Sequence, residues 1–255
     1  MYNPYSLENK KILVTGASSG IGKATAIECA KLGASVVVTA RNEERLKSVF
    51  EELDRSLGQE HQMVIADLAT DEGLAYLLSQ VDKLNGVSSN AGILKSQVPV
   101  KFIKDDEMLD LVNTNLFSHV RLARDLYKKK KLEKGASYVF TASTGGVTTH
   151  VIGNSVYDIS KSAVNSFAKS CAVDFASRNI RCNSVCPSMI ETPMTTPDGV
   201  LTQENYNKDI EAHYLLGRYG KPREVALTTA FLLSDASSFI TGASIMIDGG
   251  VSVNH

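Results

Sequence analysis

The sequence has few cysteines, and their surroundings argue against a metal site. Four occur in the 255 residues, Cys29, Cys171, Cys182 and Cys186, each within an apolar pattern typical of a buried helix or strand. Cys182 and Cys186 lack the histidines or the second cysteine pair that a zinc site requires. We therefore expect no metal site and four reduced thiols in the core.

The chain also has little net charge and no long apolar run. The formal net charge is −1, which gives no reason to expect a nucleic-acid partner. No run of about 18 apolar residues occurs, and residues 1–10 are polar where a secretory signal is apolar. We expect a cytoplasmic protein without a membrane partner, in which the basic run Lys128–Lys131 is a solvated helix face.

No linker or internal repeat divides the chain. Its hydrophobic content of 43% over 255 residues is enough to bury a large core. Neither a Pro/Gly/Ser-rich stretch nor a change in charge pattern marks a boundary. The sequence therefore predicts one domain that spans residues 1–255.

Short apolar segments alternate with longer helical patterns along the whole chain. This alternation predicts a doubly wound parallel sheet of the Rossmann type, with helices on both faces. Helical patterns include 108–131 and 155–177, and Asn42 reads as the N-cap of another helix. The seven expected strands are 12–14, 34–40, 63–66, 86–88, 137–141, 180–185 and 244–247.

A glycine-rich turn lies between the first expected strand and the first helix. Gly16 permits a sharp turn, Gly20 lets backbone approach a ligand, and Gly22 lets the helix pack closely on the sheet. The N–H groups that open the helix would face an anion. The turn predicts a dinucleotide pyrophosphate site, the alternative being a tight turn of purely structural role.

Polar residues follow several of the expected strands. Asp67 follows the third strand, Asn90–Gly92 the fourth, Ser143 the fifth and Pro187–Ser188 the sixth. Since ligands of such sheets bind beyond the carboxyl ends of the strands, these positions should converge on one rim.

Tyr157 and Lys161 stand four residues apart in a helical pattern, so their side chains share a face. A nearby ammonium group lowers a phenol pKa, which suits the phenol to proton transfer with a carbonyl. Tyr127 and Lys131 have the same spacing but end a lysine-rich helix, where we expect exposed surface. Tyr157 differs in having Ser143 fourteen residues upstream, just past a strand.

These motifs together resemble the short-chain dehydrogenase/reductase family, in its form of about this length. The resemblance covers nearly the whole chain and departs from the usual family pattern at two small positions. Ser89 stands where the family usually has asparagine, and Ser188 where it usually has glycine. The resemblance rests on the glycine turn, Asn90-Ala91-Gly92, Asn115, Ser143, Tyr157 with Lys161, Pro187, Thr192-Pro193-Met194, Gly217-Arg218 and Asp248-Gly249-Gly250.

The resemblance implies an oxidoreductase that transfers a hydride between a nicotinamide and a carbonyl or secondary alcohol. Tyr157 would be the general acid/base, and Lys161 would lower its pKa and bind the nicotinamide ribose. Ser143 would hold the substrate oxygen, and Asn115 would fix a water that passes protons to Lys161. Substrate contacts are expected from Ser143, Val151, Tyr157 and Ser188.

The resemblance also implies the cofactor contacts. Family members that use NAD commonly end the second strand with aspartate, but here Ala40 is followed by Arg41, whose guanidinium would bind a 2′-phosphate. We therefore expect NADP(H) in preference to NAD(H). The expected contacts are Gly16, Ser18, Ser19, Gly20, Ile21, Gly22, Arg41, Asn42, Asp67, Leu68, Asn90, Ala91, Gly92, Tyr157, Lys161, Pro187, Ile190 and Thr192.

The substrate is left open by these motifs. A polar stretch near 188–215 has the length of a closing lid. Arg178 and the lysines at 128–134 occupy regions where relatives that reduce 3-oxoacyl carrier proteins bind their acidic partner, which makes acyl carrier protein an alternative to a small carbonyl or alcohol substrate. A catalytically silent dinucleotide-sensing regulator is a further alternative. A sugar-nucleotide epimerase or dehydratase would need a different glycine spacing.

The stretch 217–250 resembles the part through which relatives assemble, which predicts a homotetramer, with a dimer as the alternative.

Overall fold

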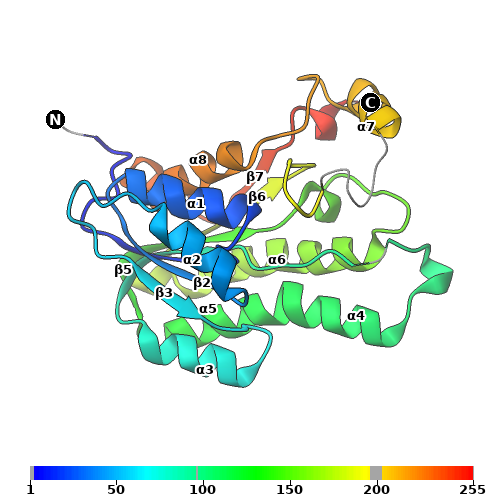
Figure 1. The fold of residues 1–255 in the computed structure, drawn as a ribbon. Coiled ribbons are helices and arrows are strands. Elements are labelled where there is room, and N and C mark those ends of the chain that lie inside the picture. Colours follow the sequence, from blue (N-terminus) through cyan, green and yellow to red (C-terminus); the bar gives the residue numbers. More distant parts are fainter. Residues whose placement is uncertain (1–2, 96, 196–202, 255) are drawn as a thin grey trace.

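A computed structural model describes residues 3–95, 97–195 and 203–254 of the chain (Figure 1). Strands and helices alternate from the N-terminus. The strands are β1 (Lys11–Thr15), β2 (Ser35–Ala40), β3 (Gln62–Ile65), β4 (Leu84–Ser89), β5 (Leu132–Thr141), β6 (Arg181–Pro187) and β7 (Ser244–Ile247). The α-helices are α1 (Gly20–Lys31), α2 (Glu43–Glu51), α3 (Asp71–Gln80), α4 (Asp105–Val112), α5 (Ser118–Lys128), α6 (Ser155–Asp174), α7 (Gln203–His213) and α8 (Pro222–Leu233).

The seven strands form one parallel sheet in the order β3-β2-β1-β4-β5-β6-β7. The order reverses direction at β1 and β4, which creates a crevice beyond their carboxyl ends. The predicted fold class, a doubly wound parallel sheet of seven strands, is confirmed. The predicted strands lie within the observed ones apart from one residue at an end of β2, β3 and β6, and β5 begins five residues earlier than expected, at Leu132.

Two apolar clusters cover the two faces of the sheet. The helices α1, α2 and α8 pack on one face, where Val36, Val38 and Leu232 are fully buried. The helices α3, α5 and α6 pack on the other face, where Val37, Leu77 and Leu126 are fully buried. Alternate valines of β2 therefore enter opposite clusters, as expected for a strand covered on both sides.

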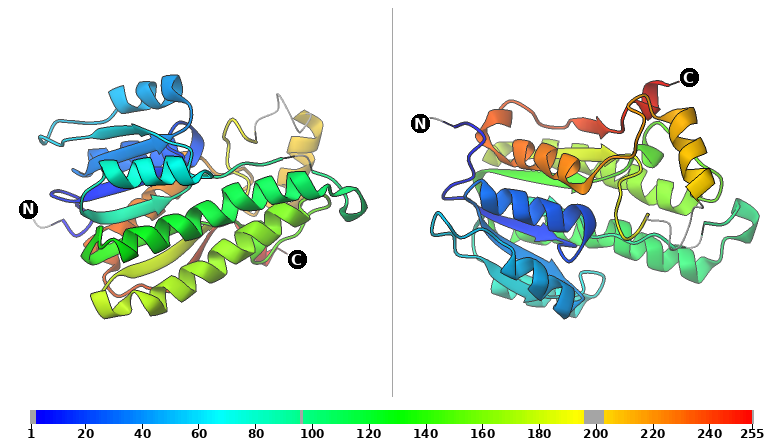
Figure 2. Two further views of the ribbon diagram at one scale, coloured as in Figure 1. Left: turned by 90° about the horizontal axis from the view of Figure 1, so that it is seen from below. Right: turned by 45° about the horizontal axis from the view of Figure 1, so that its top comes forward.

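The segment predicted as one helix over 108–131 contains an irregular turn. It comprises α4, a π-helical turn η2 (Asn113–Phe117) and α5, which follow one another beside α6 (Figure 2). A π turn widens the helix by one residue and is frequent at functional sites. Asn115, a predicted site residue, lies within it.

All four cysteines are buried and form no disulfide, in agreement with the expectation of core thiols. Burial raises the pKa of Cys29 to about 12. Among the helices of the described residues, none has the length and hydropathy needed to cross a bilayer.

Candidate active site

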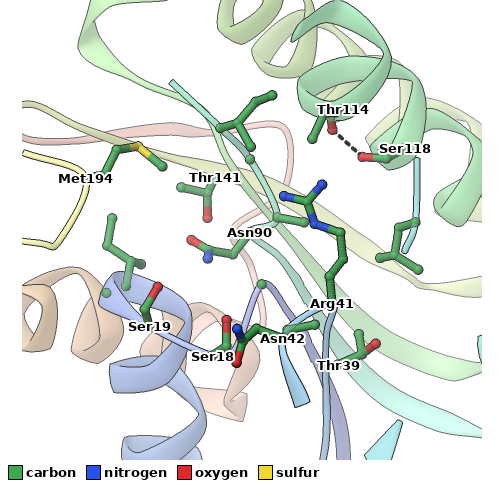
Figure 3. Close-up of a pocket in the computed structure, with 18 of the residues that line it drawn as sticks. Ser18, Ser19, Thr39, Arg41, Asn42, Asn90, Thr114, Ser118, Thr141 and Met194 are labelled. Carbon is green, nitrogen blue, oxygen red and sulfur yellow. Dashed lines mark hydrogen bonds between the residues drawn. The ribbon is translucent and has the colours of Figure 1, made fainter. Parts of the chain in front are cut away.

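A cavity of about 340 Å³ lies beyond the carboxyl ends of the central strands (Figure 3). Residues that follow β1, β2, β3 and β4 line it, together with residues of α6 and the segment 192–194. Of the residues expected on one rim, Asp67 and Asn90–Gly92 line this cavity, which lies where the strand order reverses between β1 and β4. Ser143, Pro187 and Ser188 do not line it.

The glycine turn leaves no room for side chains. Gly16 has a φ of +63°, and a Cβ there would lie 2.9 Å from Cα of Ala91. A Cβ on Gly22 would lie 2.2 Å from the carbonyl oxygen of Gly16, and one on Gly20 would lie 3.1 Å from Cγ2 of Thr192. The residue types thus fit the close backbone approach that a pyrophosphate requires.

The helix that follows the turn offers its first N–H groups to the cavity. Ser19 is the N-cap of α1, but its side chain makes no capping hydrogen bond. Ser18, Ser19 and Gly20 all line the cavity. The first N–H groups of a helix have no partner within the helix, and together with the helix dipole they favour an anion at this position.

Tyr157 and Lys161 reach the same cavity from α6. Nζ of Lys161 lies 5.9 Å from the centroid of the Tyr157 ring and donates a hydrogen bond to the carbonyl oxygen of Thr141 at 2.9 Å. A Cβ on Gly92 would lie 3.4 Å from both Nζ of Lys161 and Oδ1 of Asn115. The ammonium group, the amide and the backbone at Gly92 therefore converge.

The pKa values of this pair differ from the sequence expectation. Removal of the phenol from water raises the pKa of Tyr157 to about 12, although its interaction with the Ser143 hydroxyl acts in the opposite direction. Burial lowers the pKa of Lys161 to about 8. The predicted lowering of the Tyr157 pKa by Lys161 is not found, because desolvation dominates and Nζ bonds the Thr141 carbonyl.

Ser143 and Asn115 flank this pair. Ser143 precedes the short 3₁₀ turn η3 (Thr144–Gly146), and its Oγ accepts a hydrogen bond from N–H of Gly145 at 3.2 Å. Asn115 is fully buried, with Oδ1 accepting from N–H of Ile93 at 2.8 Å and Nδ2 donating to its carbonyl oxygen at 2.9 Å. The amide therefore fixes the backbone that follows Asn90–Gly92.

Two arginines, Arg41 and Arg45, line the cavity beyond β2. Nη1 of Arg41 lies 3.7 Å from Oδ2 of Asp67, and the Arg41 side chain is 58% exposed. Asn42 caps α2, its Oδ1 accepting from N–H of Arg45 at 2.9 Å. Arg45, which sequence reasoning missed, also lines the cavity. Its place one helical turn after the Asn42 cap is the signal that could have found it.

Most of the predicted cofactor contacts line the cavity. Three do not: Gly22 packs under the turn, Pro187 ends β6, and Ile190 is 3% exposed and pairs with Gly220. Lining residues absent from the sequence prediction of cofactor contacts are Thr39, Ala40, Arg45, Ala66, Ala69, Ile93, Thr114, Ser118, Thr141, Pro193 and Met194.

Of the predicted substrate contacts only Tyr157 lines the cavity; Ser143 does not line it, although its hydroxyl interacts with the Tyr157 phenol. Val151 and Ser188 lie elsewhere. Val151 is 61% exposed and lines a separate surface groove with His150 and Asp158. Oγ of Ser188 is buried and makes no hydrogen bond within the described residues, and it lies beside the phenol of Tyr214. Neither residue lines the cavity that Tyr157 and Lys161 share.

Two expectations about the surface need correction. The pair Tyr127 and Lys131 is only partly exposed, because the Tyr127 ring stacks on Phe175 at 4.1 Å and Nζ of Lys131 bonds the Val81 carbonyl. Arg178 is also partly buried, with its guanidinium 5.6 Å above the Tyr127 ring and bonded to the Leu132 carbonyl. Structural contacts thus already occupy the guanidinium that was expected to meet an acidic partner.

Comparison with known families gives one match over most of the chain. A family profile described as Enoyl-(Acyl carrier protein) reductase matches residues 16–252. The chain is 37% identical over 255 residues to a tropinone reductase homolog of Arabidopsis thaliana. The alignment covers 98% of this chain and 93% of the homolog. The chain is 33% identical over 250 residues to the 3-oxoacyl-[acyl-carrier-protein] reductase of Pseudomonas aeruginosa, covering 96% of this chain and 98% of that one.

Solved structures show the same architecture. The crystal structure of levodione reductase matches with a TM-score of 0.89 and 27% sequence identity, covering 97% of this chain and 99% of that one. A short-chain type dehydrogenase/reductase from Mycobacterium marinum matches with a TM-score of 0.86 and 31% identity, covering 98% of each chain.

Proposed function

This chain belongs to the short-chain dehydrogenase/reductase family of oxidoreductases, and on that premise we propose that it is an NADP(H)-dependent enzyme that interconverts a carbonyl and a secondary alcohol. The observation that carries the proposal is the placement of Tyr157 and Lys161 on a cavity that the glycine turn also lines. The glycine turn and α1 would hold the pyrophosphate, and Lys161 and Asn90–Gly92 the nicotinamide half.

The nicotinamide, when bound, supplies or accepts the hydride. Tyr157 handles the proton: its phenol, with a pKa of about 12, is protonated at neutral pH and can donate to a carbonyl oxygen during reduction. Ser143, whose hydroxyl interacts with the phenol, would hold that oxygen in place. Lys161 would bind the nicotinamide ribose, and its pKa of about 8 leaves the lysine mostly charged at pH 7.

The role of Tyr157 can be tested against a matched control within the chain. Tyr157→Phe should lower kcat for a ketone by about 10²–10⁴-fold, the usual contribution of a general acid. Dinucleotide affinity should change little, because only the hydroxyl is removed. Tyr127→Phe alters a tyrosine with the same spacing to a lysine and should keep wild-type kcat. Equal activity of both variants would contradict the proposal and favour a dinucleotide-sensing regulator.

The NADP(H) preference rests on the charge beyond β2. Arg41 and Arg45 line the cavity there, and Ala40 stands at the end of the strand in place of a carboxylate. Arg41→Ala should weaken NADP(H) binding by about tenfold or more, since a charge-assisted hydrogen bond to phosphate is lost. NAD(H) binding should change less than threefold. Calorimetric titration checks both values, and NAD(H) binding to the wild type at least as tightly as NADP(H) would overturn the preference.

The substrate is proposed to be a small carbonyl compound or alcohol, enclosed by a lid near residues 188–215. Residues 196–202 of that region lie outside the described residues. A 3-oxoacyl-carrier-protein substrate is the second candidate, favoured by the 33% identity with the Pseudomonas aeruginosa reductase. Steady-state rates on a ketone panel and on acyl thioesters, with and without carrier protein, discriminate the two. A rate gain of tenfold or more from the carrier protein would favour the second candidate.

A further inference from the structure

A buried histidine lies behind the cavity and has no place in the mechanism above. His119 is on α5, one turn after Asn115, and is 1% exposed. Its Nε2 lies 2.8 Å from the carbonyl oxygen of Ala91, and its Nδ1 lies 2.6 Å from Oγ of Ser89. Because a carbonyl oxygen can only accept, Nε2 carries the proton and Nδ1 accepts from the Ser89 hydroxyl.

The ring is held in this neutral form. Burial, and after it the charge of Lys161, lower the pKa of His119 to about 3. A ring that stays neutral with a fixed tautomer is not a general acid or base near pH 7. It acts instead as a rigid link between the two hydrogen-bond partners.

Both backbone groups of Ala91 are bonded to side chains from other elements. Its N–H donates to Oγ1 of Thr15 at 3.1 Å, and its carbonyl oxygen accepts from His119. The neighbouring N–H of Asn90 also donates to Thr15, at 2.9 Å. Ala91 is thereby fixed from β1 on one side and from α5 on the other, with Gly16 packed against its Cα.

We propose that His119 is a positioning residue of the cofactor site, which holds Asn90–Gly92 in the shape that receives a dinucleotide. Ser89 sets the tautomer that allows this bond. The proposal gives a role to Ser89, which departs from the asparagine usual in the family, as one half of a hydrogen-bonded pair with His119. It rests on the proposed function, in that the cavity must bind a dinucleotide.

Three substitutions of His119 distinguish the contributions of its two ring nitrogens. In His119→Gln the side-chain amide can reach as far as Nε2 and keep a donor for Ala91. In His119→Asn the shorter amide reaches only the position of Nδ1, and His119→Leu keeps bulk without any hydrogen bond. We expect the dissociation constant for the dinucleotide to rise about tenfold in the Asn and Leu variants and less than threefold in the Gln variant.

A matched core substitution tests whether His119 has only a structural role. Leu126 is fully buried on the same helix, two turns away, and its replacement by alanine leaves a cavity in the core. Leu126→Ala should lower the free energy of unfolding as much as His119→Leu but leave the dissociation constant within twofold of wild type. Equal dissociation constants for Leu126→Ala and His119→Leu, or equal values for the Gln and Leu variants, would overturn the proposal.

The tautomer gives a readout that needs no cofactor. Nitrogen NMR of the imidazole rings, assigned by the signal lost in His119→Gln, should show His119 protonated at Nε2 alone at pH 7. Ser89→Ala should let the other tautomer appear. A doubly protonated His119 at pH 7 would overturn the inference. If wild-type protein bound neither NADPH nor NADH, the proposed function itself would fail, whatever the NMR result.

Discussion

At the scale of single residues, Lys161 shows a conflict between stability and function. Lys161 is 4% exposed, and its ammonium donates a hydrogen bond to one backbone carbonyl, that of Thr141. Burying a charge with so little compensation is unfavourable, which is why its pKa falls from 10.5 to about 8. The lysine is therefore retained at a cost in folding free energy, as expected for a group that serves the chemistry.

We predict that Lys161→Met stabilises the folded protein while abolishing most activity. The fall of the Lys161 pKa from 10.5 to about 8 corresponds to a penalty of about 3 kcal/mol, and leaving the Thr141 carbonyl without a partner costs about 1 kcal/mol. The free energy of unfolding at pH 7 should thus rise by about 2 kcal/mol. Urea unfolding monitored by circular dichroism measures it.

The pH dependence of that gain has a definite sign. Below pH 8 the lysine is protonated in both the folded and the unfolded state, so the penalty is fully present. Between pH 8 and 10.5 the folded state loses its proton first and the penalty declines. The advantage of the methionine variant should therefore shrink over this range. A gain that stays constant from pH 7 to 10 would contradict the burial argument.

Residue identities were predictable from sequence where the backbone dictates them. Gly16 and Gly20 line the cavity and Gly22 packs beneath the turn, because the spacing of these glycines between a strand and a helix admits few structures. Val151 and Ser188 were assigned to the substrate, but the structure places them away from the cavity. Their directions depend on how loops pack against α6 and Tyr214, and no sequence period encodes that packing.

At the scale of elements, two helices begin at residues whose side chains cap them, and one of these residues also lines the cavity. The sequence predicted Asn42 as an N-cap, and its side chain does accept from N–H of Arg45 at the start of α2. Thr70 caps α3 in the same way, accepting from N–H of Gly73 at 3.1 Å. The π turn at Asn113–Phe117 was not predicted, because its local sequence does not interrupt the helical pattern. Within it, Asn115 makes two hydrogen bonds to the Ile93 backbone, a contact between segments distant in the sequence.

The two caps provide a matched pair for a second prediction. Asn42→Ala and Thr70→Ala should each lower the free energy of unfolding by about 1 kcal/mol, the usual value of an N-cap. Only Asn42 lines the cavity, so only Asn42→Ala should raise the dissociation constant for NADP(H), by about threefold to tenfold. Urea unfolding and calorimetric titration give the two quantities. The same dissociation constant in both variants would remove Asn42 from the proposed site.

At the scale of the whole molecule, the alternation of strands and helices was enough to predict the sheet. Parallel strands joined by helices place every connection on a face, so a regular alternation leaves few topologies. The strand order then brings the segments after β1 and β4 together, although 74 residues separate Asn90 from Gly16. The sequence pattern does not predict which exposed apolar residues contact another subunit, because it does not distinguish them from other exposed apolar residues.

The C-terminal stretch 217–250 carries the prediction about assembly. Phe239 is fully exposed at 102%, and Leu227 on α8 is 43% exposed. A large aromatic side chain in water is a candidate for a subunit contact, and we predict a homotetramer that uses this surface. Burial of a phenylalanine side chain contributes about 1.5–3 kcal/mol, so the two copies of Phe239 in a symmetric two-chain contact would together contribute about 4 kcal/mol.

Phe239→Glu should therefore raise the dissociation constant of that contact by about a thousandfold and convert tetramers to dimers at micromolar concentration. Phe102→Glu is the matched control, because Phe102 is 60% exposed but lies outside the C-terminal stretch. It should leave the assembly unchanged. Light scattering coupled to size-exclusion chromatography distinguishes the states. A monomeric wild type would refute the tetramer and the dimer alike, and a tetrameric Phe239→Glu would place the contact on another surface.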